Sequence, residues 1–327
     1  MTAPVLEICL SDTDVTEALH HDVRVGLSAD PKWLPPKWFY DARGSELFEQ
    51  ITTLPEYYPT RTERELLRHS AREIAGRATV DTLVELGSGS SEKTRLLLDA
   101  LTARGSLHRF VPLDVSESAL RGAMAAVTQE YPRLAVHGVV GDFTRHLELL
   151  PVGRNGRRLV AFLGGTIGNL LPDERTAFLT ALRAALDPGE LLLLGVGLVT
   201  DPTVLVPAYD DAAGVTAEFN RNVLHVLNRE LGADFDVAAF DHVAVWDTAQ
   251  EWIEMRLRAR RAMTVRLPAV GMTVHYAEGE EMCTEVSGKF RREVLSAELV
   301  DSGFADLMWW TDPDDRFALV LASAVRT

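Results

Sequence analysis

The sequence predicts an α/β protein whose main domain is a Rossmann-like parallel sheet with helices on both faces. Between residues 61 and 199, short apolar segments alternate with segments of helical periodicity. The apolar segments are continuous rather than alternating, which is typical of strands buried on both faces. The first of them runs into a glycine-rich turn, Gly87-Ser88-Gly89, at the edge of the sheet where such folds bind ligands.

The order of these segments fits a doubly covered sheet. The expected strands are 79–86, 108–115, 133–143, 157–165 and 189–199, and the expected helices are 93–103, 116–131 and 172–186. Near the end of the chain, 296–304 is expected to be a helix, followed by strands at 305–313 and 316–325. Together the strands make a seven-stranded sheet.

Residues 200–287 interrupt this alternation. A long helix is expected within 210–235, and antiparallel strands within 253–268 and 272–290. Earlier in the chain, helical spacing appears at 44–54 and from Thr62 onwards. We therefore predict a Rossmann-like domain of residues 61–199 and 288–327, and a second, α+β domain of residues 1–60 and 200–287.

Composition excludes several classes of protein. The formal net charge of −15 argues against a nucleic-acid or anionic-membrane partner, because phosphate groups require a basic face. With no apolar run of membrane-spanning length and no leader-like N-terminus, the sequence predicts a cytosolic protein with Cys9 and Cys283 reduced. The nine histidines form no HExxH motif or Cys/His cluster, so no metal site is predicted.

Three ligands compete for the glycine-rich turn. The dinucleotide pattern Gly-x-Gly-x-x-Gly fails because Glu92 replaces its third glycine. The phosphate-binding pattern that ends in Gly-Lys-Thr fails at the same residue, although Lys93 and Thr94 fit it. A P-loop phosphotransferase is therefore the weakest alternative, and a binding module without catalytic activity stays open.

S-adenosylmethionine is the third ligand, and it suits the polar residues at the strand ends. Glu85 precedes the turn by two residues, and Asp114 ends the second strand, where a carboxylate can accept hydrogen bonds from ribose hydroxyls. Asp142 ends the third strand, next to an adenine position that Phe143 can cover. The ordered set predicts a site for S-adenosylmethionine.

Five blocks of the chain resemble the histidine-specific Nα-methyltransferase family. They are LPEYYPTRTE, ELGSGSSEKT, FLGGTIGNL, YDDAAGVTAEFNRNVL and EEMCTEVSGKF. Bacterial members in ergothioneine biosynthesis convert L-histidine to Nα,Nα,Nα-trimethylhistidine (hercynine). The resemblance implies a class I methyltransferase fold, a seven-stranded Rossmann-like sheet with a second, substrate-binding domain. Fungal tryptophan-type N-methyltransferases are similar to this family, so tryptophan or another aromatic amino acid stays an alternative substrate.

The resemblance also implies roles for individual residues. Asn169 and Tyr209 match positions that hold the carboxylate of the substrate, and Glu285 and Ser287 match the pair that binds its imidazole. Tyr57 matches an active-site tyrosine, and Tyr40 and Phe48 match aromatics that line the pocket. The residues at cofactor positions are Gly87, Lys93, Asp114, Asp142, Phe143 and Gly164.

Further expectations concern chemistry and departures from the pattern. We expect Tyr40 to accept the proton of the amine, with Tyr57 beside it. A strand period of two predicts that Glu285 and Ser287 share a face with Cys283. Taken alone, Asn169 also fits a turn, the three aromatics a core, Glu285 an outward position and Lys93 a solvated one.

One residue departs from the family pattern: Gly197 stands where members usually have an acidic residue. We expect the protein to be a monomer and its substrate to be a free amino acid, a small molecule.

Overall fold

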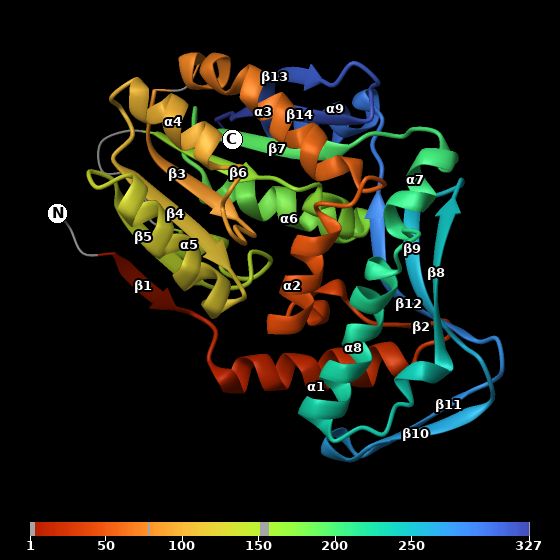
Figure 1. The fold of residues 1–327 in the computed structure, drawn as a ribbon. Coiled ribbons are helices and arrows are strands. Elements are labelled where there is room, and N and C mark those ends of the chain that lie inside the picture. The colour runs from red at the N-terminus through yellow and green to blue at the C-terminus, as the bar shows by residue number, and fades with distance from the viewer. Residues whose placement is uncertain (1–3, 78, 151–156, 327) are drawn as a thin grey trace. The chain divides into compact units, whose positions relative to one another are not determined.

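The computed structural model describes residues 4–77, 79–150 and 157–326. The chain divides into two compact units, each assembled from segments far apart in the sequence (Figure 1). The first unit comprises Met1–Leu10, Pro59–Val199 and Lys289–Thr327, and the second comprises Ser11–Tyr58 and Thr200–Gly288.

The predicted domain ranges differ from these units at the N-terminus. Residues 4–10 belong to the first unit, not to the second, because they contribute a strand to its sheet. The predicted ranges also include residues 1–3, 78, 151–156 and 327, which lie outside the described residues.

The first unit is built on a sheet whose strand order is β1-β5-β4-β3-β6-β7-β14-β13. The strands are β1 (Val5–Ile8), β3 (Val80–Leu86), β4 (Arg109–Asp114), β5 (Ala135–Val140), β6 (Arg157–Phe162), β7 (Leu191–Gly197), β13 (Phe304–Thr311) and β14 (Phe317–Ala324). The first six of these run parallel in the sheet, β14 is antiparallel to β7, and β13 is antiparallel to β14. The predicted α/β fold is confirmed.

The count of seven strands is wrong, because β1 adds an eighth at the edge of the sheet. It pairs in parallel with β5, and Glu7 lies opposite Val139. Val5 and Ile8 are more than half exposed, so this four-residue strand has too little apolar periodicity to be recognised from the sequence.

Helices cover both faces of this sheet (Figure 1). They are α3 (Tyr58–Arg77), α4 (Arg95–Ala103), α5 (Glu117–Glu130), α6 (Pro172–Ala185) and α9 (Arg292–Asp301), with the 3-10 helices η2 (Leu147–Leu149) and η3 (Thr166–Asn169). Alternate residues of β3 enter two separate cores: Leu83 packs with α3, α4 and α5, and Val84 packs with α6 and α9. This alternation explains why the strands are apolar throughout.

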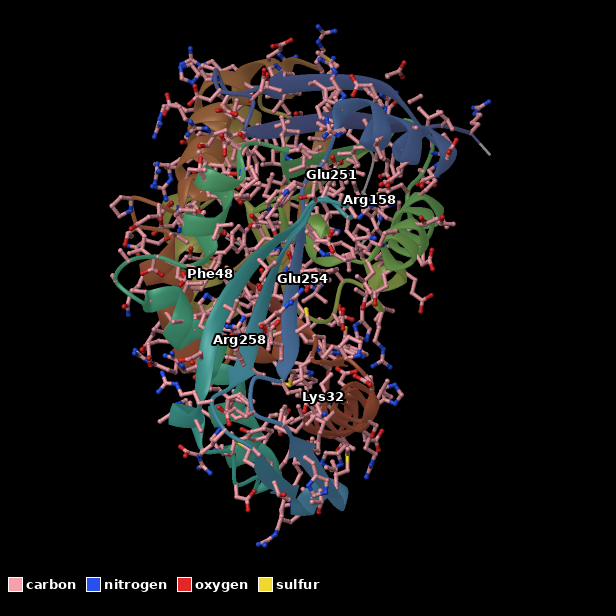
Figure 2. The ribbon with its side chains drawn as sticks, turned by 90° about the vertical axis from the view of Figure 1, so that its right-hand side faces the viewer. Lys32, Phe48, Arg158, Glu251, Glu254 and Arg258 are labelled. Carbon is pink, nitrogen blue, oxygen red and sulfur yellow. The ribbon has the colours of Figure 1, made fainter. Side chains whose placement is uncertain are left out.

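A buried ion pair between Arg158 and Glu190 stabilises this core where β6 begins. The guanidinium of Arg158, labelled in Figure 2, makes a hydrogen bond of 2.6 Å from Nη2 to Oε2 of Glu190. The Glu190 carboxylate also accepts from the backbone amides of Arg158 and Asp187, and Arg158 donates to the carbonyl of Ala185. The pair therefore ties the start of β6 to the loop before β7.

The second unit has a four-stranded sheet of order β2-β12-β9-β8 and a two-stranded sheet of β10 and β11. Its strands are β2 (Lys32–Trp33), β8 (Phe240–Asp247), β9 (Trp252–Ala259), β10 (Met263–Leu267), β11 (Met272–Tyr276) and β12 (Glu281–Gly288). Its helices are α1 (Asp12–Ser28), α2 (Ala42–Ile51), α7 (Pro202–Tyr209) and α8 (Val215–Leu231), with η1 (Pro36–Phe39), η4 (Val237–Ala239) and η5 (Pro268–Val270). The predicted strands within 253–290 and the helix within 210–235 are confirmed.

The two faces of β9 differ in character. Glu254 and Arg258, labelled in Figure 2, project from one face with Arg256, which bonds to Glu254 and to Glu281 of β12. Ile253 and Met255, which alternate with these charged residues along β9, are buried in the apolar core of the unit. The sheet therefore has a charged outer face and an apolar inner face.

Among the described residues, no helix has the length and apolar character needed to cross a membrane.

Candidate active site

The glycine-rich turn after β3 adopts a backbone that only glycine takes easily. Gly87 has a φ of 67° and Gly89 a φ of 48°, both in the left-handed region. A Cβ added at either residue would meet no atom within 4 Å. The glycines are therefore required by backbone conformation, and the open space beside them leaves room for a ligand to approach the main chain.

Asp114 connects this turn to the end of β4. Its Oδ2 accepts a hydrogen bond of 2.8 Å from the amide of Gly89, and its Oδ1 accepts one of 2.9 Å from the amide of Ser116. Burial raises the pKa of Asp114, although these amide donors act in the opposite direction. The two carboxylate oxygens together offer about four lone-pair positions, which leaves Asp114 able to accept a further hydrogen bond from a hydroxyl group.

Glu85 lies beneath the turn rather than at its surface. Its side chain is buried, and it accepts hydrogen bonds from the hydroxyls of Thr94 and Ser91, the latter at 2.9 Å. Burial raises the pKa of Glu85 to about 7, against the opposing effects of Thr94, Ser91 and Lys93. In this structure Glu85 stabilises the conformation of the turn through its hydrogen bonds to Ser91 and Thr94.

Lys93 is not a solvated residue. Its ammonium forms an ion pair with Glu63 of α3, whose side chain is fully buried. Oε1 of Glu63 also accepts a hydrogen bond of 2.7 Å from the amide of Gly164. One carboxylate thus links two predicted cofactor positions, Lys93 after β3 and Gly164 after β6.

Sequence reasoning missed Glu63 as a site residue. Its position in the first turns of a helix suggested only a favourable interaction with the helix dipole. No local pattern signals that a glutamate on α3 reaches the ends of β3 and β6, because the contacts span 30 and 101 residues of sequence.

The remaining predicted residues of the first unit lie at strand ends. Asp142 follows β5 and accepts from the amide and hydroxyl of Thr144. The ring of Phe143 packs 4.9 Å from that of Phe162, centroid to centroid. Asn169 is half-buried at the end of η3.

In the second unit the predicted aromatic residues form one cluster. Ring centroids are 5.6 Å apart for Tyr40 and Phe48, 6.3 Å for Phe48 and Tyr57, and 6.2 Å for Tyr57 and Tyr209. Phe219 of α8 completes the cluster at 5.4 Å from Tyr40, and sequence reasoning did not identify it. The segments that carry these rings are far apart in the sequence, from Tyr40 to Phe219, so only the folded unit brings them together.

A β-bulge in β12 sets the direction of Glu285 and Ser287. Cys283 lies opposite Arg256 and Glu285 lies opposite Met255, so Thr284 is an extra residue with no partner in β9. Glu285 and Ser287 therefore face the apolar side of the sheet, where they are buried.

The prediction that Cys283 shares the face of Glu285 and Ser287 is wrong, because the bulge breaks the period of two. Cys283 faces the outer side with Arg256. Burial, with the charge of Glu254 nearby, raises the pKa of Cys283 to about 12, so its thiol stays neutral.

Tyr209 of α7 lies against this strand. Its hydroxyl and that of Ser287 are 2.8 Å apart and share a hydrogen bond. Burial, with the charge of Glu285 adding to it, raises the pKa of Tyr209. The second unit thus holds a carboxylate, two hydroxyls and aromatic rings within an otherwise apolar interior, a set suited to a small polar molecule with an aromatic ring.

Comparison with known proteins identifies the family. A family model described as histidine-specific methyltransferase, dependent on S-adenosylmethionine, matches residues 19–324. The chain belongs to this family.

Individual relatives of this methyltransferase agree with the family model. The histidine N-alpha-methyltransferase of Mycolicibacterium smegmatis is 58% identical over 313 residues, which are 96% of this chain and 97% of the relative. The protein of the same description from Mycobacterium tuberculosis is 58% identical over 306 residues, 94% of this chain and 95% of the relative. The 4-dimethylallyltryptophan N-methyltransferase of Claviceps purpurea is 31% identical over 216 residues, 63% of this chain and 62% of the relative.

The chain is therefore an S-adenosylmethionine-dependent N-methyltransferase. The first unit fits this donor: the turn at Gly87 and Gly89 is open, and Asp114 can accept a further hydrogen bond from a hydroxyl group. When bound, S-adenosylmethionine supplies an electrophilic methyl group on a positively charged sulfur.

Proposed function

We propose that this methyltransferase transfers three methyl groups in succession to the α-amine of L-histidine, giving Nα,Nα,Nα-trimethylhistidine. The observation that carries this proposal is the pair of Glu285 and Ser287, which the bulge in β12 directs to the apolar face beside Tyr209. A carboxylate buried on an apolar face can accept a charge-assisted hydrogen bond from the N–H of an imidazole.

The proposed site assigns a role to each polar residue of the set. Glu285 accepts a hydrogen bond from an imidazole N–H, and the hydroxyl of Ser287 bonds to the second ring nitrogen. The phenol of Tyr209 donates to the carboxylate of the amino acid, and Asn169 keeps the role in substrate binding that the resemblance implies. Because its pKa is raised, Tyr209 keeps its proton and remains a donor over the whole physiological pH range.

Cofactor binding belongs to the first unit in this proposal. Asp114 accepts from ribose hydroxyls, and Asp142 and Phe143 contact the adenine. Gly87 and Gly164 allow close approach of the main chain, and Lys93, held by Glu63, supplies a positive charge for a carboxylate. Glu85 contributes by holding the turn through Thr94 and Ser91.

The proton of the amine must leave before each transfer, because only the neutral amine is a nucleophile. We assign its acceptance to Tyr40, whose hydroxyl oxygen takes the ammonium proton as its own proton passes to water, with Tyr57 in the same aromatic cluster orienting the amine. The rings of Tyr40, Phe48 and Tyr57 also suit the trimethylammonium product, since a ring face attracts such a cation by about 0.5–2 kcal/mol. The same pocket therefore serves all three transfers.

Mass spectrometry of histidine incubated with the enzyme and S-adenosylmethionine tests the proposal directly. We expect one, two and then three added methyl groups. Tryptophan is the second candidate substrate, favoured by the similarity to the 4-dimethylallyltryptophan N-methyltransferase of Claviceps purpurea. Methylation of tryptophan in preference to histidine would contradict the proposal.

A variant pair tests the role of Glu285. Glu285→Ala removes the carboxylate from the inner face of the sheet, and Glu254→Ala removes one from the outer face of the neighbouring strand. Sites that bond a polar group reject analogues lacking it by factors on the order of 10⁴, so Glu285→Ala should weaken histidine use strongly and favour tryptophan or phenylalanine. Equal histidine-to-tryptophan ratios in the two variants would refute the assignment.

The proposal includes a place in ergothioneine biosynthesis and a monomeric enzyme in the cytosol. Two proteins described as ergothioneine biosynthesis protein 1 support the pathway. That of Neurospora crassa is 35% identical over 205 residues, 62% of this chain and 23% of the relative, and that of Schizosaccharomyces pombe is 31% identical over 242 residues, 71% of this chain and 31% of the relative. The unpaired cysteines Cys9 and Cys283 suit a reducing compartment. Light scattering on the purified chain tests the monomer.

A further inference from the structure

The bulge in β12 depends on side chains outside the predicted substrate set. Thr284, the extra residue, is buried, and its hydroxyl lies 2.6 Å from Oδ1 of Asn220 and 3.0 Å from the carbonyl oxygen of Met255. Asn220 belongs to α8 and Met255 to β9. A single hydroxyl proton therefore connects the bulge both to the neighbouring strand and to the helix packed on the sheet.

Asn220 passes this connection on to a buried histidine. Its amide nitrogen lies 2.8 Å from Nδ1 of His242 and 3.1 Å from the carbonyl of Arg256, so both amide protons are used. Nε2 of His242 lies 2.8 Å from the carbonyl oxygen of Tyr209. The imidazole side chain is only 1% exposed, and burial lowers the pKa of His242, which keeps the ring neutral.

These bonds fix the direction of every donor. The carbonyl of Tyr209 can only accept, so Nε2 carries the proton and Nδ1 accepts from Asn220. The Asn220 Oδ1 then accepts from Thr284. Rotating the amide by half a turn would place its oxygen against the carbonyl of Arg256, so one arrangement satisfies the network and the reverse does not.

The alternative to the bulge is a regular strand shifted by one residue. Thr284 would then lie opposite Met255, and Glu285 would lie opposite Glu254 on the charged outer face. A shift of one residue turns each following side chain to the other face, and like charges directly opposite are unfavourable. The site therefore requires that the extra residue stay out of register.

We propose that Thr284, Asn220 and His242 are positioning residues. They hold Thr284 in the bulge and so determine selectivity for histidine. Through Thr284 the network orients Glu285 and Ser287, and through His242 it holds the main chain at Tyr209. The inference rests on the proposed function for its substrate, but the network itself is independent of it.

Thr284→Val tests the network, since valine keeps the shape and removes the hydroxyl. The oxygen of Asn220 then loses its donor, and we expect the KM for histidine to rise about tenfold. The ratio of kcat/KM for histidine to that for tryptophan should fall, and the KM for S-adenosylmethionine should stay unchanged. Thr284→Ser keeps the hydroxyl, so its KM values and selectivity should stay close to those of wild type. Thr273→Val, at an exposed residue of β11, is the matched control.

Two results would overturn the proposal. One is a Thr284→Val enzyme with the selectivity and histidine KM of wild type. The other is an equal loss of affinity for histidine and S-adenosylmethionine, which indicates a general structural defect. If Thr284→Val does not accumulate as folded protein, His242→Phe breaks the same network from its other end and is subject to the same criteria.

Amide hydrogen exchange separates this inference from the proposed function. In Thr284→Val the amides of residues 281–288 should exchange at least about tenfold faster than in Thr273→Val. This holds even if the wild-type enzyme does not methylate histidine, a result that would refute only the proposed function. Equal exchange in the two variants would refute the network.

Discussion

Glu85 offers a sharp test of how the glycine-rich turn is held. Its carboxyl is buried, and its pKa is raised from 4.5 to about 7. A raised carboxyl pKa means that the folded chain binds the proton more tightly than the unfolded chain does. The resulting stabilisation is fully present below about pH 4.5 and is lost as the pH rises through about 7.

The size of the effect follows from the shift. A difference of about 2.5 pKa units corresponds to about 3 kcal/mol in the free energy of unfolding, and most of it falls between about pH 5 and pH 8. Glu85→Gln has the same shape and does not titrate, so the stability of wild type relative to this variant should fall by that amount over the same range. The two hydroxyls donate to different oxygens of Glu85, so in the glutamine variant one of them keeps its bond to the amide oxygen and the other must turn to accept from the amide nitrogen.

Urea unfolding of the chain without ligands, followed by circular dichroism at several pH values, measures this difference. Glu92→Gln is the control, because Glu92 belongs to the same turn and its side chain is 63% exposed. Its curve should run parallel to that of wild type. Parallel curves for Glu85→Gln and wild type would refute the reasoning, because they would show that Glu85 has the same proton affinity in both states.

Two further predictions concern the first unit. A Cβ at Gly195 would lie 1.9 Å from Oε1 of Glu63, so Gly195→Ala should displace that carboxylate from Lys93 and weaken S-adenosylhomocysteine binding about tenfold by calorimetry. Gly122→Ala, where a Cβ meets nothing within 4 Å, should leave the affinity unchanged, and equal affinities for both variants would contradict the prediction. Arg158→Met leaves Glu190 buried without its guanidinium and should cost about 3–5 kcal/mol in urea unfolding. Arg158→Met/Glu190→Gln should recover part of this loss, because a neutral amide is less costly to bury than an unpaired carboxylate and its oxygen can still accept from a backbone amide. A single variant as stable as wild type would refute the prediction.

The sequence was sufficient for the main sheet and for most of the elements of both units. The strands of the first unit are buried on both faces, so their apolar runs are continuous and easily recognised. The positions of the proposed cofactor residues were predictable for a related reason: parallel strands place their carboxyl ends together, and Glu85, Asp114 and Asp142 each lie at such an end or close to one.

What could not be predicted depends on contacts between distant segments. The bulge at Thr284 lies within an alternating sequence, and its position depends on Asn220, 64 residues away. The role of Glu63 depends in the same way on Gly164, and that of Phe219 on Tyr40. Strand β1 is short and half exposed, so only its pairing with β5 reveals it.

The place of β14 in the sheet has a consequence for a truncated chain. This strand follows β13 in the chain, yet it lies inside the sheet, bonded to β7 on one side and to β13 on the other. Without Phe317–Ala324, the backbone N–H and C=O groups at one edge of the apolar strand β7 have no partner strand. An unpaired apolar edge of this kind favours aggregation. A chain truncated before Phe317 therefore lacks an interior strand of the sheet, and β7 and β13 lose the partner that they share.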